Sequence, residues 1–222
     1  MLQQTSKKIS LYLFLFLILG SLNNKDLTNK EFPKIKKIDI QGFKARNDKF
    51  IKKLDLLKKK SLFDLNKSNV KEILNSNNLI EEYTIFKRYP SSLEIKILET
   101  TLLGLINKNG ANFYIGSNGK LIKASDELMN LPFIFGELNI KNFLLLKKII
   151  DNSKLDYEEI QNLFFFPSGR WDIELTSGVL IKLPITDIKN SLDLSLRLIN
   201  SKEFMNIKSI DVRPLNQVIV NE

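Results

Sequence analysis

The sequence contains no cysteine and no histidine. Without cysteine, the chain forms no disulfide, carries no thiolate nucleophile and offers no cysteine ligand to zinc. Without histidine, it lacks the most common general base, the serine–histidine pair of hydrolases and the most common transition-metal ligand. Only carboxylate, lysine or tyrosine chemistry remains. The composition therefore argues against an enzyme, and we expect neither a cofactor nor a metal site.

The charge of the chain is unbalanced, with 34 Lys and Arg against 25 Asp and Glu and a formal net charge of +9. Such an excess can serve nucleic acid or an anionic membrane surface. The lysines are spread over all 222 residues, whereas nucleic-acid-binding patches are clustered, which favours a solvated surface. The length and the hydrophobic content of 43% allow one large domain or two small ones.

An uncharged run near the N-terminus, residues 9–22 (ISLYLFLFLILGSL), follows Lys7 and Lys8. It is shorter than the about 20 residues of a usual membrane span, so it fits a retained anchor whose flanking lysines reach the headgroups or a cleaved signal peptide. We expect a tail over 1–8, a transmembrane anchor over 9–22 and a linker over 23–34. The lysines that follow the run would, counted alone, place the larger part of the chain in the cytoplasm.

The next 70 residues or so alternate between strand and helix patterns. Ile38 and Ile40 alternate with polar residues, which predicts a strand over 35–42. A helix with Asn47 as its cap and a second helix with an Asn69–Glu72 capping box follow. Two strands, 81–89 and 93–99, turn at Pro90. The predicted order is strand–helix–helix–strand–strand.

The rest of the chain predicts mostly strands. The Asn118–Gly119 pair between two apolar runs is a strong hairpin signal. Residues 139–151 and 186–204 have helical periodicity, the segments 157–166, 170–176 and 179–184 have strand patterns, and 207–214 with 217–220 form a final hairpin. The fold class is therefore α+β, with a mostly antiparallel second half.

Three segments invite a chemical interpretation, and each has a plainer one. Asp156, Glu158 and Glu159 could perform acid–base catalysis, but solvated carboxylates on a polar segment are the simpler reading. The loop 116–119 joins two strands and lacks the Lys-Ser/Thr ending of a phosphate loop, which indicates a turn. The Arg170–Trp171 pair could anchor a partner, although a Trp on an alternating strand favours the core.

Several segments, in order, resemble the FtsQ/DivIB cell-division family. Residues 83–99 (YTIFKRYPSSLEIKILE) are similar to the hairpin that closes the family's POTRA domain. Residues 114–122 (YIGSNGKLI), 170–184 (RWDIELTSGVLIKLP) and 209–220 (SIDVRPLNQVIV) resemble segments of its β domain. The chain departs from the family pattern at Gly116, Pro184 and Pro214.

The resemblance implies a bitopic protein without catalysis: an N-terminal membrane helix, a POTRA domain over 35–101 and an FtsQ-type β domain over 102–222. It implies a cytoplasmic N-terminus, with the bulk in the periplasm at the division septum, against the simple lysine count. The implied role is a divisome scaffold that links early and late division proteins. The implied partners are FtsB-like and FtsL-like bitopic proteins and the inner membrane, with no nucleic acid and no small-molecule substrate.

The resemblance also implies a partner-binding strand and its hairpin neighbour. An exposed sheet edge offers unpaired backbone groups to an incoming strand. The expected site residues are Ile210, Val212, Arg213, Gln217, Val218, Ile219 and Val220. Against this, the preceding helix could cover a short edge strand, and Pro214 cannot donate to a ladder.

The tip of the POTRA hairpin is a second candidate surface. This tip, Lys87, Arg88 and Tyr89, is either a solvated corner, which we favour, or part of a recruitment surface.

Three other functions remain as alternatives. POTRA domains also precede outer-membrane assembly or secretion barrels, which need many more alternating strands. An exported carboxylate hydrolase would depend on Glu158, Glu159 or Asp172. A cytoplasmic nucleic-acid binder would lose affinity steeply with salt.

Overall fold

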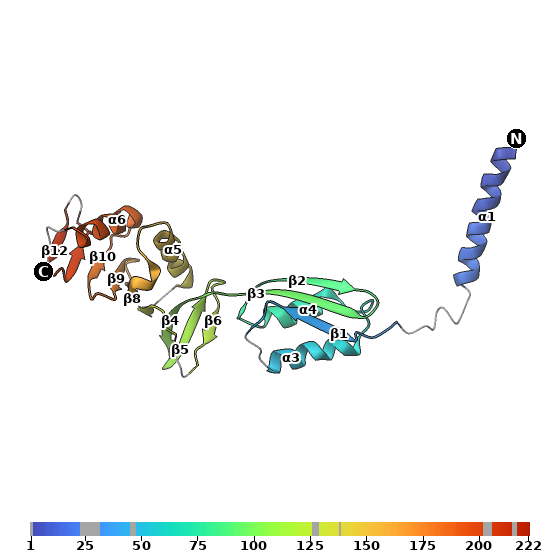
Figure 1. The fold of residues 1–222 in the computed structure, drawn as a ribbon, viewed down its shortest axis with the longest axis horizontal. Helices are drawn as coiled ribbons and strands as arrows, with labels where there is room; N and C mark the ends of the chain where they lie inside the picture. Colours follow the sequence, from blue (N-terminus) through green and yellow to red (C-terminus); the bar gives the residue numbers. More distant parts are fainter. Residues whose placement is uncertain are drawn as a thin grey trace.

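The computed structural model of the protein describes residues 2–22, 32–44, 48–125, 129–137, 139–201, 206–214 and 217–222. An N-terminal helix is followed by a first unit built on a three-stranded sheet and a second unit built on a nine-stranded sheet (Figure 1). Asn47, the predicted cap of the first unit's first helix, lies outside the described residues, as does most of the predicted linker.

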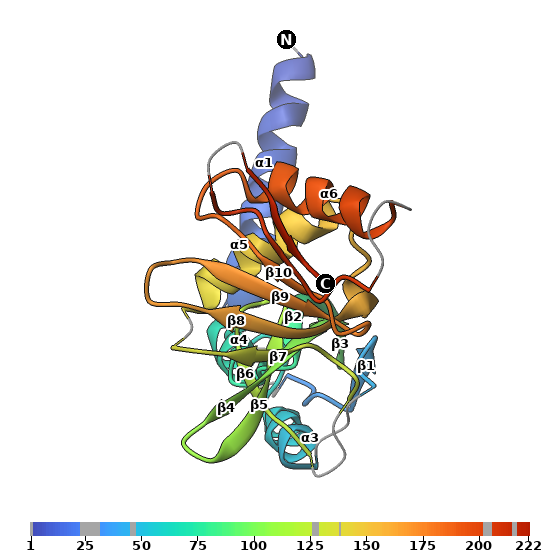
Figure 2. The ribbon, with the colours of Figure 1, turned by 90° about the vertical axis from the view of Figure 1, so that its left-hand side faces the viewer.

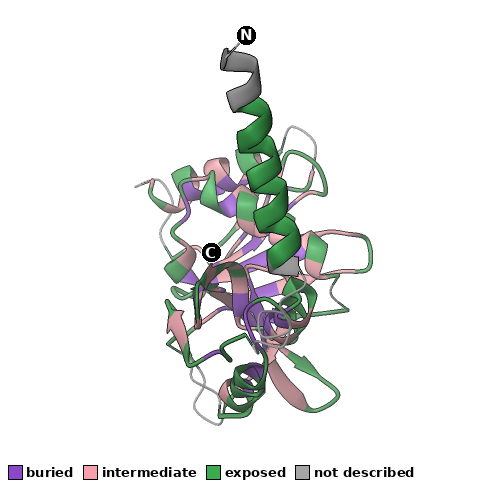
Figure 3. Cartoon of the chain, turned by 90° about the vertical axis from the view of Figure 1, so that its right-hand side faces the viewer, coloured by how far each residue is buried: buried purple, intermediate pink, exposed green. Residues whose placement is uncertain are grey.

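The N-terminal helix α1 (Leu2–Leu22) exposes all of its described side chains, residues 7–20 (Figure 3). Large apolar side chains lie on all sides of it, from Ile9 to Leu19, and their exposed fractions run from 38% at Ile18 to 75% at Phe16. Among the described residues, no helix combines the length and the apolar character that crossing a membrane requires.

The first unit has the predicted strand–helix–helix–strand–strand order. Its elements are β1 (Lys37–Gln41), α3 (Asp48–Asp55), the 3₁₀ helix η1 (Leu56–Lys59), α4 (Lys67–Asn75), β2 (Ile80–Arg88) and β3 (Ser92–Glu99). The sheet order is β1-β3-β2, with β1 parallel and β2 antiparallel to the central strand. The central strand β3 buries every second side chain, Leu93, Ile95 and Ile97, and these pack with the inner faces of α3 and α4.

The predicted capping box at Asn69 is wrong, because α4 begins earlier. Asn66 is the N-cap, and its side chain accepts a hydrogen bond from the Ser68 amide at 3.0 Å. Asn69 lies inside the first turn. A cap must precede the helix to accept from its free amides, and Asn66 meets this condition four residues before Val70, where the apolar stripe begins.

The second unit consists of one long sheet and two helices. Its elements are β4 (Leu102–Lys108), β5 (Ala111–Gly116), β6 (Leu121–Lys123), β7 (Phe133–Phe135), α5 (Ile140–Asp151), the 3₁₀ helix η2 (Tyr157–Glu159), β8 (Ile160–Phe165), β9 (Trp171–Leu175), β10 (Leu180–Lys182), α6 (Ile188–Ile199), β11 (Ser209–Asp211) and β12 (Ile219–Asn221). The sheet order is β12-β11-β10-β9-β8-β7-β4-β5-β6.

Five of the eight strand pairs in this sheet are antiparallel, as expected, and three are parallel: β4–β7, β7–β8 and β10–β11. β4 and β7 were not among the predicted strands. The strand predicted over 157–166 begins only at Ile160, because residues 157–159 form η2.

Helices α5 and α6 lie on the same side of the sheet (Figure 2). Phe143, Leu146 and Ile150 of α5, with Leu192 and Leu196 of α6, join one buried cluster with the sheet's inner side chains. Trp171 belongs to this cluster and is 3% exposed, which confirms the core interpretation of the Arg170–Trp171 pair.

The β5–β6 turn joins the second unit to the first through hydrogen bonds. The Asn118 side-chain amide donates to the carbonyls of Asn78 at 2.9 Å and of Ile80 at 3.1 Å. Ser117 donates to a Glu81 carboxylate oxygen at 2.7 Å. These contacts connect the turn to the beginning of β2, so the predicted Asn118–Gly119 turn also forms part of the junction between the units.

Candidate functional site

The strand β12 is one edge of the nine-stranded sheet. It pairs antiparallel with β11, and the sheet order gives it no second neighbour among the described residues. In an antiparallel pair, alternate residues direct their backbone N–H and C=O groups away from the partner strand. The outer side of β12 therefore presents backbone groups with which another strand could pair.

The inner side chain of β12 holds the strand to the core. The registers place Ile173, Ile181, Ile210 and Val220 in one row across β9, β10, β11 and β12. The first three are fully buried, and Val220 closes the row with a half-buried side chain. Val218, just before the strand, also packs against this core. Hydrophobic contacts on the core-facing side of the sheet therefore hold the edge strand in place.

The outer face carries a second row with a different character. The registers align Asp172, Lys182, Asp211 and Ile219 across the same four strands. Acidic and basic side chains alternate along this row until it ends at Ile219, whose side chain is 55% exposed. Opposite charges on neighbouring strands attract one another, and Lys182 lies between the two aspartates of the row.

Two arginines complete the row. Arg213 donates to both carboxylate oxygens of Asp211, with its Nε 2.7 Å from Oδ1. Arg170 forms an ion pair with Asp172, with 3.2 Å between Nε and Oδ1. The bidentate contact of Arg213 with Asp211 fixes the orientation of its guanidinium. Arg213 is therefore held beside Ile219 at the rim of the edge.

The two aspartates differ in pKa. The hydrogen bonds from Arg213 are the main cause that lowers the pKa of Asp211 below its ordinary value. Burial is the main cause that raises the pKa of Asp172, and Arg170, Arg213 and Lys182 oppose it. Asp211 near the edge is therefore a stabilised anion, whereas Asp172 deeper in the row is a carboxylate whose ionised form is disfavoured.

A cavity of about 490 Å³ lies beside the β11–β12 connection. The loop before α6, the helix and the hairpin line it, and its polar and apolar side chains include Asp187, Ser191, Leu194, Val212, Arg213, Gln217 and Val218. A side chain of a strand added along β12 could enter this hollow. Helix α6 therefore lines one side of this cavity near the edge. In the sheet order, β12 remains the terminal strand.

The structure brings the predicted site residues together, but in different environments. Arg213, Gln217 and Ile219 are exposed, Val218 and Val220 are half-buried, and Ile210 and Val212 are buried. Only the first group has side chains free to face a partner, and the buried pair supports the edge from the core. Sequence reasoning missed Lys182 and Asp211, because their place beside Ile219 follows from strand register.

The second predicted surface, Lys87, Arg88 and Tyr89, is partly engaged within the chain. The Lys87 ammonium donates to the carbonyls of Leu62 at 2.6 Å and Leu65 at 2.8 Å. Arg88 pairs with Glu94 at 2.8 Å. Arg88 and Tyr89 nevertheless remain exposed, with 63% of the Arg88 side chain and 57% of Tyr89 accessible to solvent.

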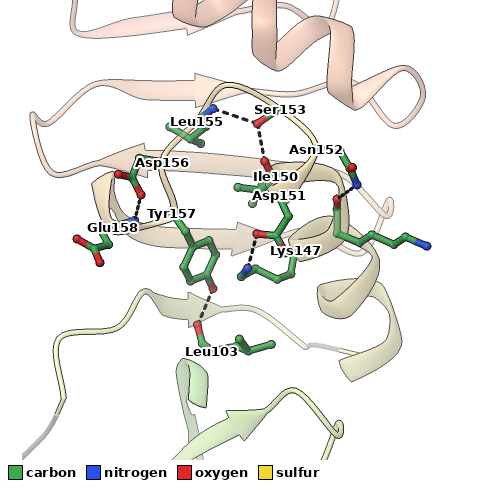
Figure 4. A network of polar contacts seen from close by, with 11 residues as sticks. Leu103, Lys147, Ile150, Asp151, Asn152, Ser153, Leu155, Asp156, Tyr157 and Glu158 are labelled. Carbon is green, nitrogen blue, oxygen red and sulfur yellow. Dashed lines mark hydrogen bonds and ion pairs between the residues drawn. The ribbon is translucent and has the colours of Figure 1, made fainter. Parts of the chain in front are cut away.

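The carboxylates considered for catalysis have structural surroundings. Asp156 caps η2 by accepting a hydrogen bond from the Glu158 amide at 3.1 Å, and Glu158 and Glu159 are exposed (Figure 4). Between them and α5, the Tyr157 hydroxyl donates to the Leu103 carbonyl at 2.5 Å. Burial is the main cause that raises the pKa of this phenol. The network ties η2 to β4.

Within the part of the chain that the structure describes, no group of three or more acidic side chains could hold a metal ion.

Two family models match successive parts of the chain. The POTRA domain of FtsQ type matches residues 33–100, and the C-terminal domain of cell division protein FtsQ/DivIB matches residues 104–213. The chain belongs to the FtsQ/DivIB family. The first unit is thus the family's POTRA domain, and the second carries its C-terminal domain up to β11 and Arg213.

Individual relatives agree with the family models. A cell division protein FtsQ from Rickettsia bellii is 26% identical over 194 residues, which cover 85% of this chain and 72% of the relative. A second FtsQ, from Bradyrhizobium diazoefficiens, is 25% identical over 72% of this chain, which spans about half (48%) of that relative's length.

One solved structure, the major extracytoplasmic domain of the trans isomer of DivIB from Geobacillus stearothermophilus, aligns with 42% of this chain and 86% of its own. It has 12% identity and a TM-score of 0.34, a likeness too weak to bear on the fold.

Proposed function

We propose that this FtsQ/DivIB family member is a non-enzymatic scaffold of the bacterial divisome that binds an FtsB-like or FtsL-like partner along β12. The observation that carries the proposal is the open edge of β12, with exposed Ile219 beside the fixed Arg213. The family resemblance supports the identity of the partners. The proposed mode is strand addition, in which backbone hydrogen bonds supply affinity and side-chain contacts supply selectivity.

Three features of the edge suit an incoming strand. Its backbone is fixed by the buried row that ends at Val220, so little order has to be gained on binding. Ile219, the first residue of β12, offers an exposed apolar contact. Arg213 keeps its guanidinium in one orientation through Asp211, and its outer N–H groups can meet a carboxylate of the partner.

The proposal includes a membrane anchor. Helix α1 exposes apolar side chains all round, and such a helix needs an apolar environment. In the proposed topology, residues 9–22 lie in the inner membrane as a single pass, although α1 falls short of the length and apolar character of a usual span. Residues 1–8 are cytoplasmic, and a POTRA domain over 35–101 and a β domain over 102–222 are periplasmic at the septum. Lys7 and Lys8 would extend to the headgroups at one end of the short run.

The test is the affinity of the purified full-length chain for the FtsB-like protein of the same organism. We expect Ile219→Asp to weaken binding by about 2 kcal/mol or more, about 30-fold in Kd, because a charge replaces an apolar anchor of the interface. Fluorescence anisotropy with the labelled partner measures the change, and circular dichroism checks that the variant is folded.

A matched control is Leu145→Asp, which places the same charge on an exposed leucine of α5 in the same unit, 61% exposed. This variant should bind like the parent. Equal binding by all three proteins would remove the edge assignment, and no binding by the parent chain would remove the proposed partner.

A further inference from the structure

Three aromatic side chains form an exposed stack at one end of the POTRA domain. The ring centroids of Phe32 and Phe63 are 4.3 Å apart, and those of Phe63 and Tyr89 are 4.9 Å apart. Their exposed fractions are 54%, 53% and 57%. We call these three residues the aromatic tip. Apolar rings gathered at the surface of a soluble domain commonly mark an interaction site.

Backbone hydrogen bonds hold the tip together, although its members are far apart in sequence. The Ile35 amide donates to the Lys60 carbonyl at 3.0 Å, and the Lys36 amide donates to the Ser91 carbonyl at 2.8 Å. The entry segment, the end of η1 and the β2–β3 turn are therefore joined directly. The rings have a fixed arrangement before any ligand arrives, which reduces the entropy lost on binding.

Four exposed lysines lie in the segments that meet at the tip. Lys34 and Lys36 are in the entry segment, and Lys59, the last residue of η1, and Lys60, its C-cap, precede the segment that carries Phe63. Within the described parts of the chain, these four ammonium groups form no ion pair with a carboxylate. An apolar centre with unpaired cations around it is complementary to a surface that is apolar beneath an anionic layer.

The tip also lies at the end of the domain that the chain enters from α1 (Figure 1). Nine residues, 23–31, separate the last residue of α1 from Phe32. Even a fully extended chain covers at most about 35 Å in these ten steps. If α1 is anchored in a bilayer, the tip cannot move further than this from the membrane end of the helix.

We propose that the aromatic tip docks on the headgroup region of an anionic phospholipid membrane, the same bilayer that holds α1. This inference rests on the proposed anchor but not on partner binding at β12. Aromatic rings favour the level of the headgroups, where part of the ring is apolar and the hydroxyl of a tyrosine stays hydrated. The lysines bind lipid phosphates from the same side. The POTRA domain is thereby fixed in orientation and does not swing on its linker.

The absence of cysteine makes the test direct, because one introduced cysteine is the only labelling site. A spin label at Ser91→Cys reports on the tip, and one at Lys108→Cys at the end of β4 reports on the other unit. The full chain is reconstituted into vesicles of phosphatidylglycerol with phosphatidylcholine, or of phosphatidylcholine alone. Collision with a water-soluble nickel chelate measures exposure of the label.

We expect the chelate accessibility of the tip label to fall severalfold in anionic vesicles and far less in neutral ones, while the Lys108→Cys label stays accessible in both. The pair Lys59→Glu and Lys60→Glu should restore access. The control pair Lys53→Glu and Lys123→Glu changes the net charge equally but lies along a cavity beside β6, and it should have no effect. Phe63→Ala should restore part of the access in the parent background.

Three results would overturn the proposal. The tip label could stay accessible on anionic vesicles that carry the chain. Its shielding could be equal in both lipids and unchanged by the charge variants. It could be shielded in detergent in proportion to protein concentration, which would mean that a second copy covers the tip. Failure of the chain to float with vesicles would remove anchor and tip together, and the β12 binding assay would still stand.

Discussion

The two units present exposed apolar groups in opposite ways. The POTRA domain offers side chains: the rings of the aromatic tip stand outside a backbone whose entry segment is already hydrogen-bonded to η1 and the β2–β3 turn. The second unit offers backbone: β12 exposes one large side chain, Ile219, beside an unpaired row of peptide groups. A face of rings suits a fluid surface without defined partners, and an edge suits a single strand in a defined register.

The sharpest way to separate the two surfaces is to unfold one unit at a time. Gly42 and Gly136 have positive φ of 80° and 105°, and a Cβ on them would lie 2.2 Å from the Ile97 carbonyl oxygen and 2.1 Å from that of Phe165. Each Gly→Ala change should destabilise its own unit by more than about 2 kcal/mol, because backbone strain and overlap with a main-chain atom add.

Denaturant unfolding, monitored by hydrogen exchange, measures how much stability each unit loses. Gly42→Ala should impair the tip and spare binding at β12, and Gly136→Ala should do the reverse. The control is Gly110→Ala, which also has positive φ (78°) but no atom within 4 Å of the new Cβ, so it should cost only about 1 kcal/mol. Loss of both surfaces in either variant would mean that the units do not fold separately.

The junction gives the next largest effect. Asn118→Ala removes two hydrogen bonds to the POTRA domain, at about 1 kcal/mol each. Both units should keep their fold, while their mutual orientation becomes less defined. Two spin labels, at Glu82→Cys on β2 and at Lys108→Cys at the end of β4, report on this orientation. In double electron–electron resonance, the distribution of distances between them should become broader. Asn109→Ala, in a turn of the same unit, is the control, and an unchanged distribution in Asn118→Ala would show that other contacts hold the units.

The smallest effect concerns acid stability near the edge. Because the pKa of Asp211 is lowered from 3.8, its ionised form stabilises the fold above that value, and this contribution disappears as the pH falls through the lowered pKa. The difference in unfolding free energy between the parent and Asp211→Asn should therefore shrink below about pH 4.

Asp172 gives the opposite sign, since its pKa is raised. Its contribution is most favourable below 3.8 and declines as the pH rises through the raised pKa. The difference in unfolding free energy between the parent and Asp172→Asn should fall as the pH rises through that range. Parallel pH profiles for the two variants would contradict the assigned causes.

The sequence predicted the elements whose signal is local. Leu93, Ile95 and Ile97 alternate within one strand, and Ile188, Leu192, Leu196 and Ile199 repeat within one helix, so their patterns can be read without a partner. The expected final hairpin at 207–220 also formed. β7 was missed because three residues, Phe133–Phe135, are too few to show alternation, and its two parallel neighbours come from distant parts of the chain. β4 does carry a local signal, because the Asn109–Gly110 pair between β4 and β5 is typical of a hairpin turn.

The candidate surfaces were predictable to different degrees. Family resemblance led to β12 and to Ile219, whereas the alternating charge row beside it depends on the registers of four strands. The aromatic tip depends on two contacts between residues 31 and 26 positions apart, Phe32 with Phe63 and Phe63 with Tyr89, and such contacts leave no periodic pattern in the sequence. Tyr89 was identified in the sequence, but its aromatic neighbours were not.

The parallel pairing of β10 with β11 determines how the edge strand is attached to the rest of the sheet. The chain leaves β10, forms α6 and returns to place β11 alongside β10, and β12 folds back onto the other side of β11. A parallel connection cannot form as a local hairpin and requires its crossover helix. The β11–β12 hairpin is therefore attached to the rest of the sheet through this parallel pair alone. If β12 is the docking strand, as proposed, a chain without the α6 crossover would have no edge fixed to its core, and partner binding would also report on the folding of the second unit.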